Sequence, residues 1–274
     1  MAQSTADWRV NQDATNEEAY PILAQDPIWN SFALADLEPP FRDYSQFATA
    51  YQDESNQHAA CLILRHPIIG HLLSPFGAEE GVAAIFDHVS LPEYPIIQAQ
   101  EMHLSVLEGY YRPETNWKTL LRMAVPPNSM LHLKYVPHLS SHQLVKPLSI
   151  TDLPALNFFY TQHSENIFSP DLFAHAMFFG VYEGERIIAA GGTHVLSPVH
   201  KVAVIGNILT APEARGRGYA TAITATLVST LFEQSYSTVV LNVFEDNYNA
   251  IRIYERLGFR THHRLVTGKA ILTG

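Results

Sequence analysis

Cysteine and long apolar runs are nearly absent from the sequence. Cys61 is the single cysteine among 274 residues, so no disulfide can form within the chain, and a reducing compartment is the simpler expectation. No segment approaches the roughly 18 consecutive apolar residues that a membrane-spanning helix needs. The first twenty residues also lack the basic patch and apolar run of a signal peptide. We therefore expect a cytoplasmic protein without membrane contact.

Positive charge is scarce as well. The chain has 17 lysines and arginines against 27 aspartates and glutamates, which gives a formal net charge of −10. Residues 1–141 carry the whole excess, with 17 acidic and 7 basic residues, whereas residues 142–274 carry 10 of each. A nucleic-acid-binding protein needs a dense basic face, so we expect no nucleic-acid partner. The acidic surface either suits a cationic partner or simply maintains solubility.

Signatures of metal sites and hydrolases are also missing. Among the 14 histidines, His262 and His263 are adjacent in a predicted strand, so their side chains should face opposite ways. The chain contains no Cys-x2-Cys pair and no Gly-x-Ser-x-Gly nucleophile elbow. We expect no metal site, and we expect Cys61 to be buried and inert in an apolar strand.

The residues that are present predict a mixed α/β fold in two halves. A Pro-, Ser- and His-rich stretch near residues 126–141 coincides with the shift in charge, so we expect domains at 1–140 and 141–274. The first twenty residues are polar and are expected to form a loosely docked arm. In the first half, apolar spacing predicts helices at 26–37, 77–89 and 101–110, and strands at 47–51, 59–64, 68–73, 96–97 and 117–125.

The second half shows a similar order of elements. The pattern predicts a strand at 142–148, a helix from 151, a hairpin of 177–182 with 186–195, a strand at 201–209, a helix at 221–233, a strand at 238–244, a helix at 249–257, and a final strand pair of 259–263 with 265–272. The shared order raises the possibility of an internal duplication, but the two halves have too little identity to prove it.

The segment LTAPEARGRGYATA, residues 209–222, carries the most specific chemistry. It joins an apolar strand to a helix, and Gly216, Gly218 and Ala220 let backbone amides approach an anion at the positive end of that helix. Arg215 and Arg217 can add charged contacts to phosphates. The segment is neither a P-loop nor a dinucleotide fingerprint. Taken alone, it is as consistent with an ordinary turn as with a phosphate site.

A second segment, residues 247–259, extends this observation. Arg215-x-x-Gly218-x-Ala220 and the later Asn-x-x-Ala-x-x-Ile-Tyr-x-x-x-Gly-Phe sequence closely resemble the two motifs of the GNAT superfamily of acyl-CoA-dependent N-acyltransferases. The amino-acid sequence of the loop most resembles that of the glycine N-acyltransferase-like branch. The resemblance covers roughly residues 142–270, and it implies a GNAT fold there.

The resemblance also implies acetyl-CoA or coenzyme A as cofactor and a small-molecule or peptide amine as acceptor. In the family, two strands splay apart and the pantetheine arm lies between them like an added strand. The cofactor-binding residues implied are Asn207, Ile208, Leu209 and Thr210 along the strand, Arg215, Gly216, Arg217, Gly218, Tyr219, Ala220 and Thr221 around the pyrophosphate, and Asn247 beside the arm.

Catalytic residues are less completely specified. The resemblance makes Tyr254 the general acid that protonates the departing thiolate, although an aromatic on an amphipathic helix is often only a core residue. Many family members have a carboxylate on the strand before the loop, but Val202 to Leu209 contain neither an acid nor a histidine. Glu245 and His194 are the remaining candidates for the base, and the amine may also arrive unprotonated.

The first half lacks the Arg/Gly loop. Its counterpart, residues 74–81, carries Glu79 and Glu80, which would repel a pyrophosphate. We interpret this half as GNAT-like without cofactor binding, and an unrelated α/β domain is the alternative.

Three functions are therefore open. An N-acyltransferase is the main hypothesis, a non-catalytic acyl-CoA-binding or sensing module is the second, and a structural interaction protein is the third. The sequence leaves the oligomeric state open between monomer and homodimer.

Overall fold

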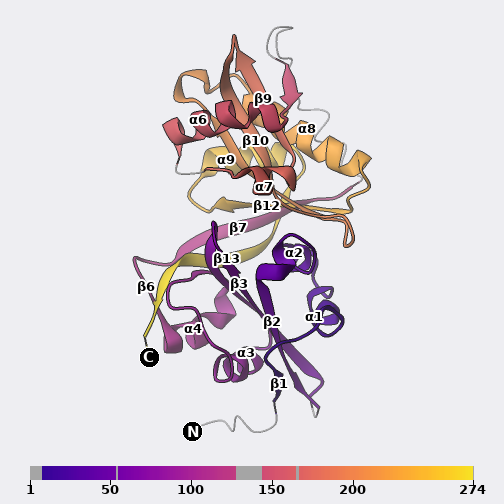
Figure 1. The fold of residues 1–274 in the computed structure, drawn as a ribbon, viewed down its shortest axis with the longest axis vertical. Helices are drawn as coiled ribbons and strands as arrows, with labels where there is room; N and C mark the ends of the chain where they lie inside the picture. Colours follow the sequence, from indigo (N-terminus) through magenta and orange to yellow (C-terminus); the bar gives the residue numbers. More distant parts are fainter. Residues whose placement is uncertain (1–7, 54, 128–143, 165–166, 274) are drawn as a thin grey trace. The chain divides into compact units, whose positions relative to one another are not determined.

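The computed structural model describes residues 8–53, 55–127, 144–164 and 167–273 (Figure 1). The chain divides into two compact units, Met1–Arg122 with His262–Gly274, and Met123–Thr261. The expected domains were 1–140 and 141–274. The N-terminal unit instead ends at Arg122 and also includes residues 262–274, because the C-terminal strand joins its sheet. Within the described residues, no helix is long and apolar enough to span a bilayer.

The N-terminal unit is an α/β structure with one sheet. Its elements are β1 (Arg9–Asn11), α1 (Asn16–Leu23), α2 (Ser31–Ala35), β2 (Ser45–Gln52), β3 (Gln57–His66), β4 (Gly70–Gly77), α3 (Glu79–Phe86), β5 (Ile96–Gln100), α4 (Leu104–Tyr110), β6 (Tyr111–Pro113), the first part of β7 (Lys118–Val125) and most of β13 (Arg260–Leu272). Strands β1 to β4 pair antiparallel in sequence order, and β4 pairs parallel with β5. Strand β13 then pairs antiparallel with β5.

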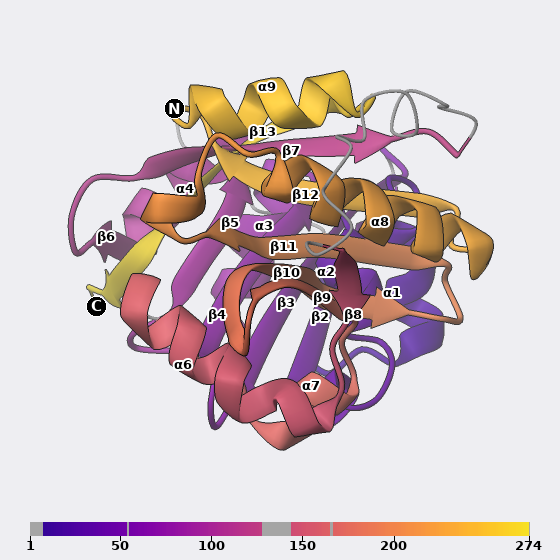
Figure 2. The same cartoon turned by 90° about the horizontal axis from the view of Figure 1, so that it is seen from above.

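The C-terminal unit repeats this topology. Its elements are β8 (Val145–Pro147), α6 (Leu153–His163), α7 (Pro170–Ala174), β9 (Phe178–Glu183), β10 (Arg186–Ser197), β11 (Val202–Thr210), α8 (Tyr219–Glu233), β12 (Thr238–Phe244) and α9 (Tyr248–Arg256). Strands β8 to β11 pair antiparallel in sequence order, and β11 pairs parallel with β12. Helices α6 and α7 lie on one side of β10 and β11, and α8 lies on the other (Figure 2).

Each unit thus contains a strand, two helices, three antiparallel strands, a helix and a parallel strand. Apolar side chains explain the packing in both. Ile63, Leu73 and Ile85 are fully buried in the N-terminal unit, and Leu227 and Val240 are fully buried in the C-terminal unit. The repeated topology supports the internal duplication that the order of elements suggested.

Several local expectations need correction. The polar N-terminal segment is not a loose arm throughout, because residues 9–11 form β1 and residues 16–23 form α1. Thr15 and Glu18 make a reciprocal capping box at the start of α1, which satisfies backbone amides that would otherwise be exposed. The helix expected at 26–37 shortens to the five residues of α2. The expected final strand pair is one continuous strand, β13, held by its register with β5.

Cys61 is fully buried in β3, as expected. Desolvation raises the pKa of its thiol, so the reactive thiolate is disfavoured.

Candidate functional site

Strands β11 and β12 separate halfway along their length. Their parallel pairing runs from Val202 beside Thr238 to Ile205 beside Leu241. Beyond this point β11 keeps its other neighbour, because Gly206, Leu209 and Thr210 still pair with β10. The opposite edge of Ile208, Leu209 and Thr210 lines a cleft of about 770 Å³. An extended ligand therefore has access to an unpaired strand edge, as strand addition requires.

The cleft also reaches the start of α8. It is lined by ten of the predicted cofactor-binding residues: Ile208, Leu209, Thr210, Arg215, Gly216, Gly218, Tyr219, Ala220, Thr221 and Asn247. Gly216 and Gly218 have φ angles of +77° and +84°, a left-handed backbone that favours glycine. Gly218 is the N-cap residue of α8 and provides no side-chain cap. The first-turn amides and the positive end of a 15-residue helix are thus directed at the cleft.

Individual side chains around the loop differ in their partners. The hydroxyl oxygen of Thr210 is buried without a hydrogen-bond partner and belongs to a residue that lines the cleft. An orphaned buried hydroxyl fits a site that a polar ligand completes. Arg215 lines the cleft, whereas Arg217 does not and instead lies 3.8 Å from Glu183. The Arg217 side chain thus lies toward Glu183 and not among the cleft-lining residues, so its predicted contact with the pyrophosphate stays a prediction.

Helix α9 forms another wall of the cleft. Asn247 is its N-cap, and its side-chain oxygen accepts a hydrogen bond from the amide of Ala250 at 3.2 Å. Ile253 lines the cleft, but the neighbouring Tyr254 does not. Tyr254 is buried with its ring 6.0 Å from the ring of Phe259, and desolvation raises its pKa to about 12. The phenol carries its proton at neutral pH, as an unperturbed tyrosine also does, and its catalytic role stays a prediction.

His194 lies at the point where the two strands separate. A side chain at Gly206 would overlap the His194 imidazole, so the missing side chain makes room for the ring. Gly206 directly follows Ile205, the last residue of β11 that pairs with β12. His194 is exposed over part of its surface, and desolvation of the imidazole lowers its pKa to about 4. Glu245, the other predicted base, lies in the turn after β12 and is half-buried.

Residue Asn207 adopts a left-handed backbone, with φ of +56°. The adjacent pairing of β10 with β11 is irregular between Ala190 and Gly192 and again between Thr193 and Val195. The Tyr160 hydroxyl on α6 donates a hydrogen bond to the carbonyl of Asn207. Sequence reasoning missed Tyr160, because no motif marks it. Asn207 itself is not among the residues lining the cleft, which leaves its predicted contact with the cofactor untested.

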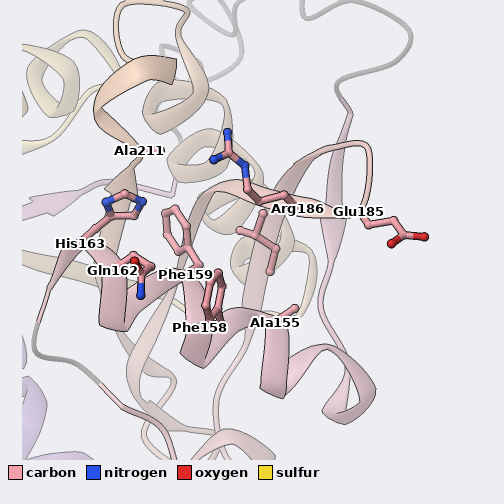
Figure 3. Close-up of a pocket in the computed structure, with 9 residues that line it drawn as sticks. Ala155, Phe158, Phe159, Gln162, His163, Glu185, Arg186 and Ala211 are labelled. Atoms are coloured by element: carbon pink, nitrogen blue, oxygen red, sulfur yellow. The ribbon is translucent and has the colours of Figure 1, made fainter.

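A second hollow, of about 490 Å³, lies against α6 (Figure 3). Phe158 and Phe159 provide its aromatic wall, and Ile187 and Ala211 are buried apolar neighbours. Arg186 extends along its edge toward the loop after β11, where it lies 3.0 Å from Glu213. Since Thr210 lines the cleft and Ala211 lines this hollow, the end of β11 borders both spaces.

The corresponding strand pair and helix start of the N-terminal unit differ from those of the C-terminal unit. Strand β4 pairs with β5 at Leu72 and Leu73, and the hydroxyl of the next residue, Ser74, donates to the Gln98 carbonyl at 2.8 Å. Glu79 and Glu80 occupy the first turn of α3, as the sequence shows.

Comparisons with known proteins agree with this geometry. Residues 148–259 match the model of a family described as the acetyltransferase (GNAT) family. Curated proteins provided no match. Several solved structures share the fold over at least 92% of this chain, at 17% identity or less.

Three of these structures illustrate the similarity. A Drosophila protein is 14% identical with a TM-score of 0.66, and the alignment covers 96% of this chain and 98% of that one. A tandem GNAT protein from the clavulanic acid biosynthesis pathway is 12% identical, with a TM-score of 0.58 and coverage of 98% and 99%. An acetyltransferase from the GNAT family of Colwellia psychrerythraea is 14% identical, with a TM-score of 0.57 and coverage of 95% and 99%. The mixed α/β fold expected from the sequence is thus confirmed: the chain has the fold of tandem GNAT proteins, and its residues 148–259 match the GNAT acetyltransferase family.

Proposed function

We propose that this protein is an acyl-CoA-dependent N-acyltransferase that transfers an acetyl or other acyl group to a primary amine. The observation that carries the proposal is the cleft, which joins an unpaired edge of β11 to the uncapped first turn of α8. An extended pantetheine arm suits the strand edge, and a pyrophosphate suits the helix end. The match of residues 148–259 to the GNAT family supports the same assignment.

The residues of the cleft have distinct binding roles in this proposal. Backbone groups of Ile208 and Leu209 pair with the pantetheine amides, and the orphaned Thr210 hydroxyl completes its hydrogen bonding with the ligand. The first-turn amides of α8 hold the pyrophosphate, and Arg215 adds a charge-assisted contact.

Bound acyl-CoA supplies an acyl group activated as a thioester. The amine nitrogen forms a bond to the acyl carbon, and the carbon–sulfur bond breaks. Tyr254 donates its phenolic proton to the departing sulfur, since a phenol carries its proton at neutral pH. The proton lost from the amine nitrogen passes to a base.

We assign this base to His194 rather than Glu245. The His194 imidazole lies against Gly206, beside the separation of β11 and β12, and its lowered pKa keeps it neutral and able to accept a proton. Gly206 lies directly opposite Gly192 in the pairing of β10 with β11. A side chain added at Gly192 would contact Phe178. The ring of Phe178 stacks on that of Phe173, which belongs to α7. Directly opposite positions share one face of a sheet, so we place the amine acceptor on the α7 side.

The acceptor itself is proposed only as a class, a small-molecule or peptide amine. The loop sequence suggests the glycine N-acyltransferase-like branch of the superfamily. For the N-terminal unit we propose a GNAT-like domain that binds no cofactor, because Ser74 and Gln98 continue the contact between β4 and β5 and the first turn of α3 carries two carboxylates.

A non-catalytic acyl-CoA sensor is the second candidate, because β11 carries no acidic or histidine side chain. Release of free thiol from acetyl-CoA over a panel of primary amines distinguishes the two. The transferase releases thiol in proportion to N-acylated product with at least one amine. A sensor binds coenzyme A in calorimetry and releases no thiol above the rate without protein.

A further inference from the structure

Arginine side chains extend the cleft along α9. Arg252 and Arg256 line the main cleft and also a neighbouring hollow of about 420 Å³, whose other lining residues are Glu255 and Arg260. With Arg215, the main cleft has three arginines, and none of its lining residues is acidic. This concentration of positive charge stands out in a chain with a formal net charge of −10.

Interactions within α9 explain a positive charge at Arg256 but not at Arg252. Arg256 is in the last turn, where the helix dipole favours a positive charge. Arg252 lies one turn earlier on the same face, and like charges at this spacing repel each other. Within the described part of the chain, neither forms an ion pair with a carboxylate. Arg260 differs, because it donates hydrogen bonds to the carbonyls of Glu255 and Phe259.

The pyrophosphate alone does not require these two arginines. Its proposed site is the first turn of α8 with Arg215, while Arg252 and Arg256 come from a different helix on the other wall. Two exposed guanidinium groups one helical turn apart suit a phosphomonoester, which offers three oxygens and nearly two negative charges. Coenzyme A carries one such group, on the 3′ position of its ribose.

We propose that Arg252 and Arg256 bind this 3′-phosphate and make the protein selective for 3′-phosphorylated acyl-CoA over the dephospho form. The inference rests on the proposed function, and it adds the selectivity of the same cleft.

The test is calorimetric titration of the full chain with coenzyme A and with 3′-dephospho-coenzyme A. Wild-type protein should bind coenzyme A at least about tenfold more tightly, the factor that one charge-assisted hydrogen bond contributes. Arg252→Gln and Arg256→Gln should each reduce this ratio, and the double variant should bring it near one. Affinity for the dephospho form should stay nearly constant throughout. Arg252→Lys should keep part of the ratio, and Arg112→Gln, an exposed charge in the N-terminal unit, should keep all of it.

Two results would overturn the proposal while leaving the proposed function intact. One is equal affinity of the wild-type protein for the two ligands. The other is a double variant that loses affinity for both ligands by the same factor, which would place the arginines on the pyrophosphate. If neither coenzyme A nor the dephospho form binds, the selectivity and the proposed function are both contradicted.

Discussion

Tyr254 and His194 both have pKa values that leave them electrically neutral near pH 7. Burial raises the pKa of the Tyr254 phenol to about 12, and desolvation lowers that of the His194 imidazole to about 4. A neutral phenol can donate a proton and a neutral imidazole can accept one. The two residues therefore have complementary states for transfer of an acyl group from sulfur to nitrogen.

Replacing Tyr254 with Phe keeps the ring packing and removes the proton donor. We predict that kcat falls by roughly 10²–10⁴-fold, the usual contribution of a positioned acid, while coenzyme A affinity stays the same. Tyr248→Phe is the control, because Tyr248 is on the same helix with 68% of its surface exposed. Steady-state turnover with a responsive amine measures the effect. Equal kcat values for Tyr254→Phe and wild type, with chemistry rate-limiting, would assign Tyr254 to the core alone.

Replacing Gly206 with Ala should displace the His194 imidazole, since the added carbon overlaps the ring. We predict that Gly206→Ala and His194→Asn both lower kcat by about 10²-fold or more with little change in coenzyme A affinity. His71→Asn, an exposed histidine on β4 of the N-terminal unit, should turn over like the wild type. Full activity of a folded His194→Asn protein would exclude His194 as the base.

Stability at acidic pH provides a separate test of His194. Between pH 6.5 and about 4, the unfolded chain binds a proton at this residue and the folded chain does not. Folding stability therefore decreases as pH falls through this window, and the loss is absent above pH 6.5. We predict that His194→Asn shows a smaller decrease in Tm from pH 7 to pH 5 than the wild type. An unchanged decrease would mean that the imidazole is protonated normally in the folded protein.

At the scale of single residues, the sequence predicted the cleft-lining residues that occupy motif positions. It did not predict the residues whose place in the site depends on contacts between distant parts of the chain. Ten predicted residues line the cleft because they follow one another along β11, the loop and α8, or begin α9. Tyr160 was missed because it reaches Asn207 from 47 positions away. His194 was a candidate only by its place at a strand end, since its fit against Gly206 depends on strand register.

At the scale of elements, the loop between β11 and α8 concentrates the proposed binding energy. Gly218 has φ of +84° at the N-cap of α8, a conformation that a β-branched residue adopts only with strain. We predict that Gly218→Val lowers coenzyme A affinity by at least about tenfold, because it displaces first-turn amides that each provide a charge-assisted hydrogen bond. Calorimetry of the folded variant measures this.

Gly184→Val is the matched control for this variant. Gly184 also has a positive φ, lies in the β9–β10 turn of the same unit, and has open space around its Cα. It should lose stability without losing coenzyme A affinity. Unchanged affinity in Gly218→Val would remove the loop from the binding site.

Periodicity predicted most helices and strands, since each buries a continuous apolar face. It failed where a polar helix cap or pairing with a distant strand determines the bounds of an element. Helix α1 is polar at its start, and the Thr15–Glu18 capping box was the sequence signal that would have revealed it. The continuity of β13 depends on its pairing with β5, about 165 positions earlier in the chain, which no local pattern encodes.

At the scale of the whole molecule, the two units share one topology but differ at the corresponding strand pair. In the C-terminal unit β11 and β12 separate, whereas in the N-terminal unit Ser74 and Gln98 continue the contact between β4 and β5. The domain boundaries were predicted only approximately. Composition and charge do not reveal that β13, at the end of the chain, belongs to the N-terminal unit.

One coenzyme A should therefore bind per chain. The first turn of α3 in the N-terminal unit carries Glu79 and Glu80, whose negative charges would repel a pyrophosphate. Titration calorimetry with an independently measured protein concentration provides the stoichiometry. A value near two would mean that the N-terminal unit has kept a site.

The most direct test of the proposed function is thiol release from acetyl-CoA across a panel of primary amines, with N-acylated product quantified by mass spectrometry. Wild-type protein should release one thiol for each acylated amine, and Gly218→Val at the same acetyl-CoA concentration should be much slower. Thiol release that no amine accelerates, from a protein that binds coenzyme A, would contradict the transferase and favour the sensor.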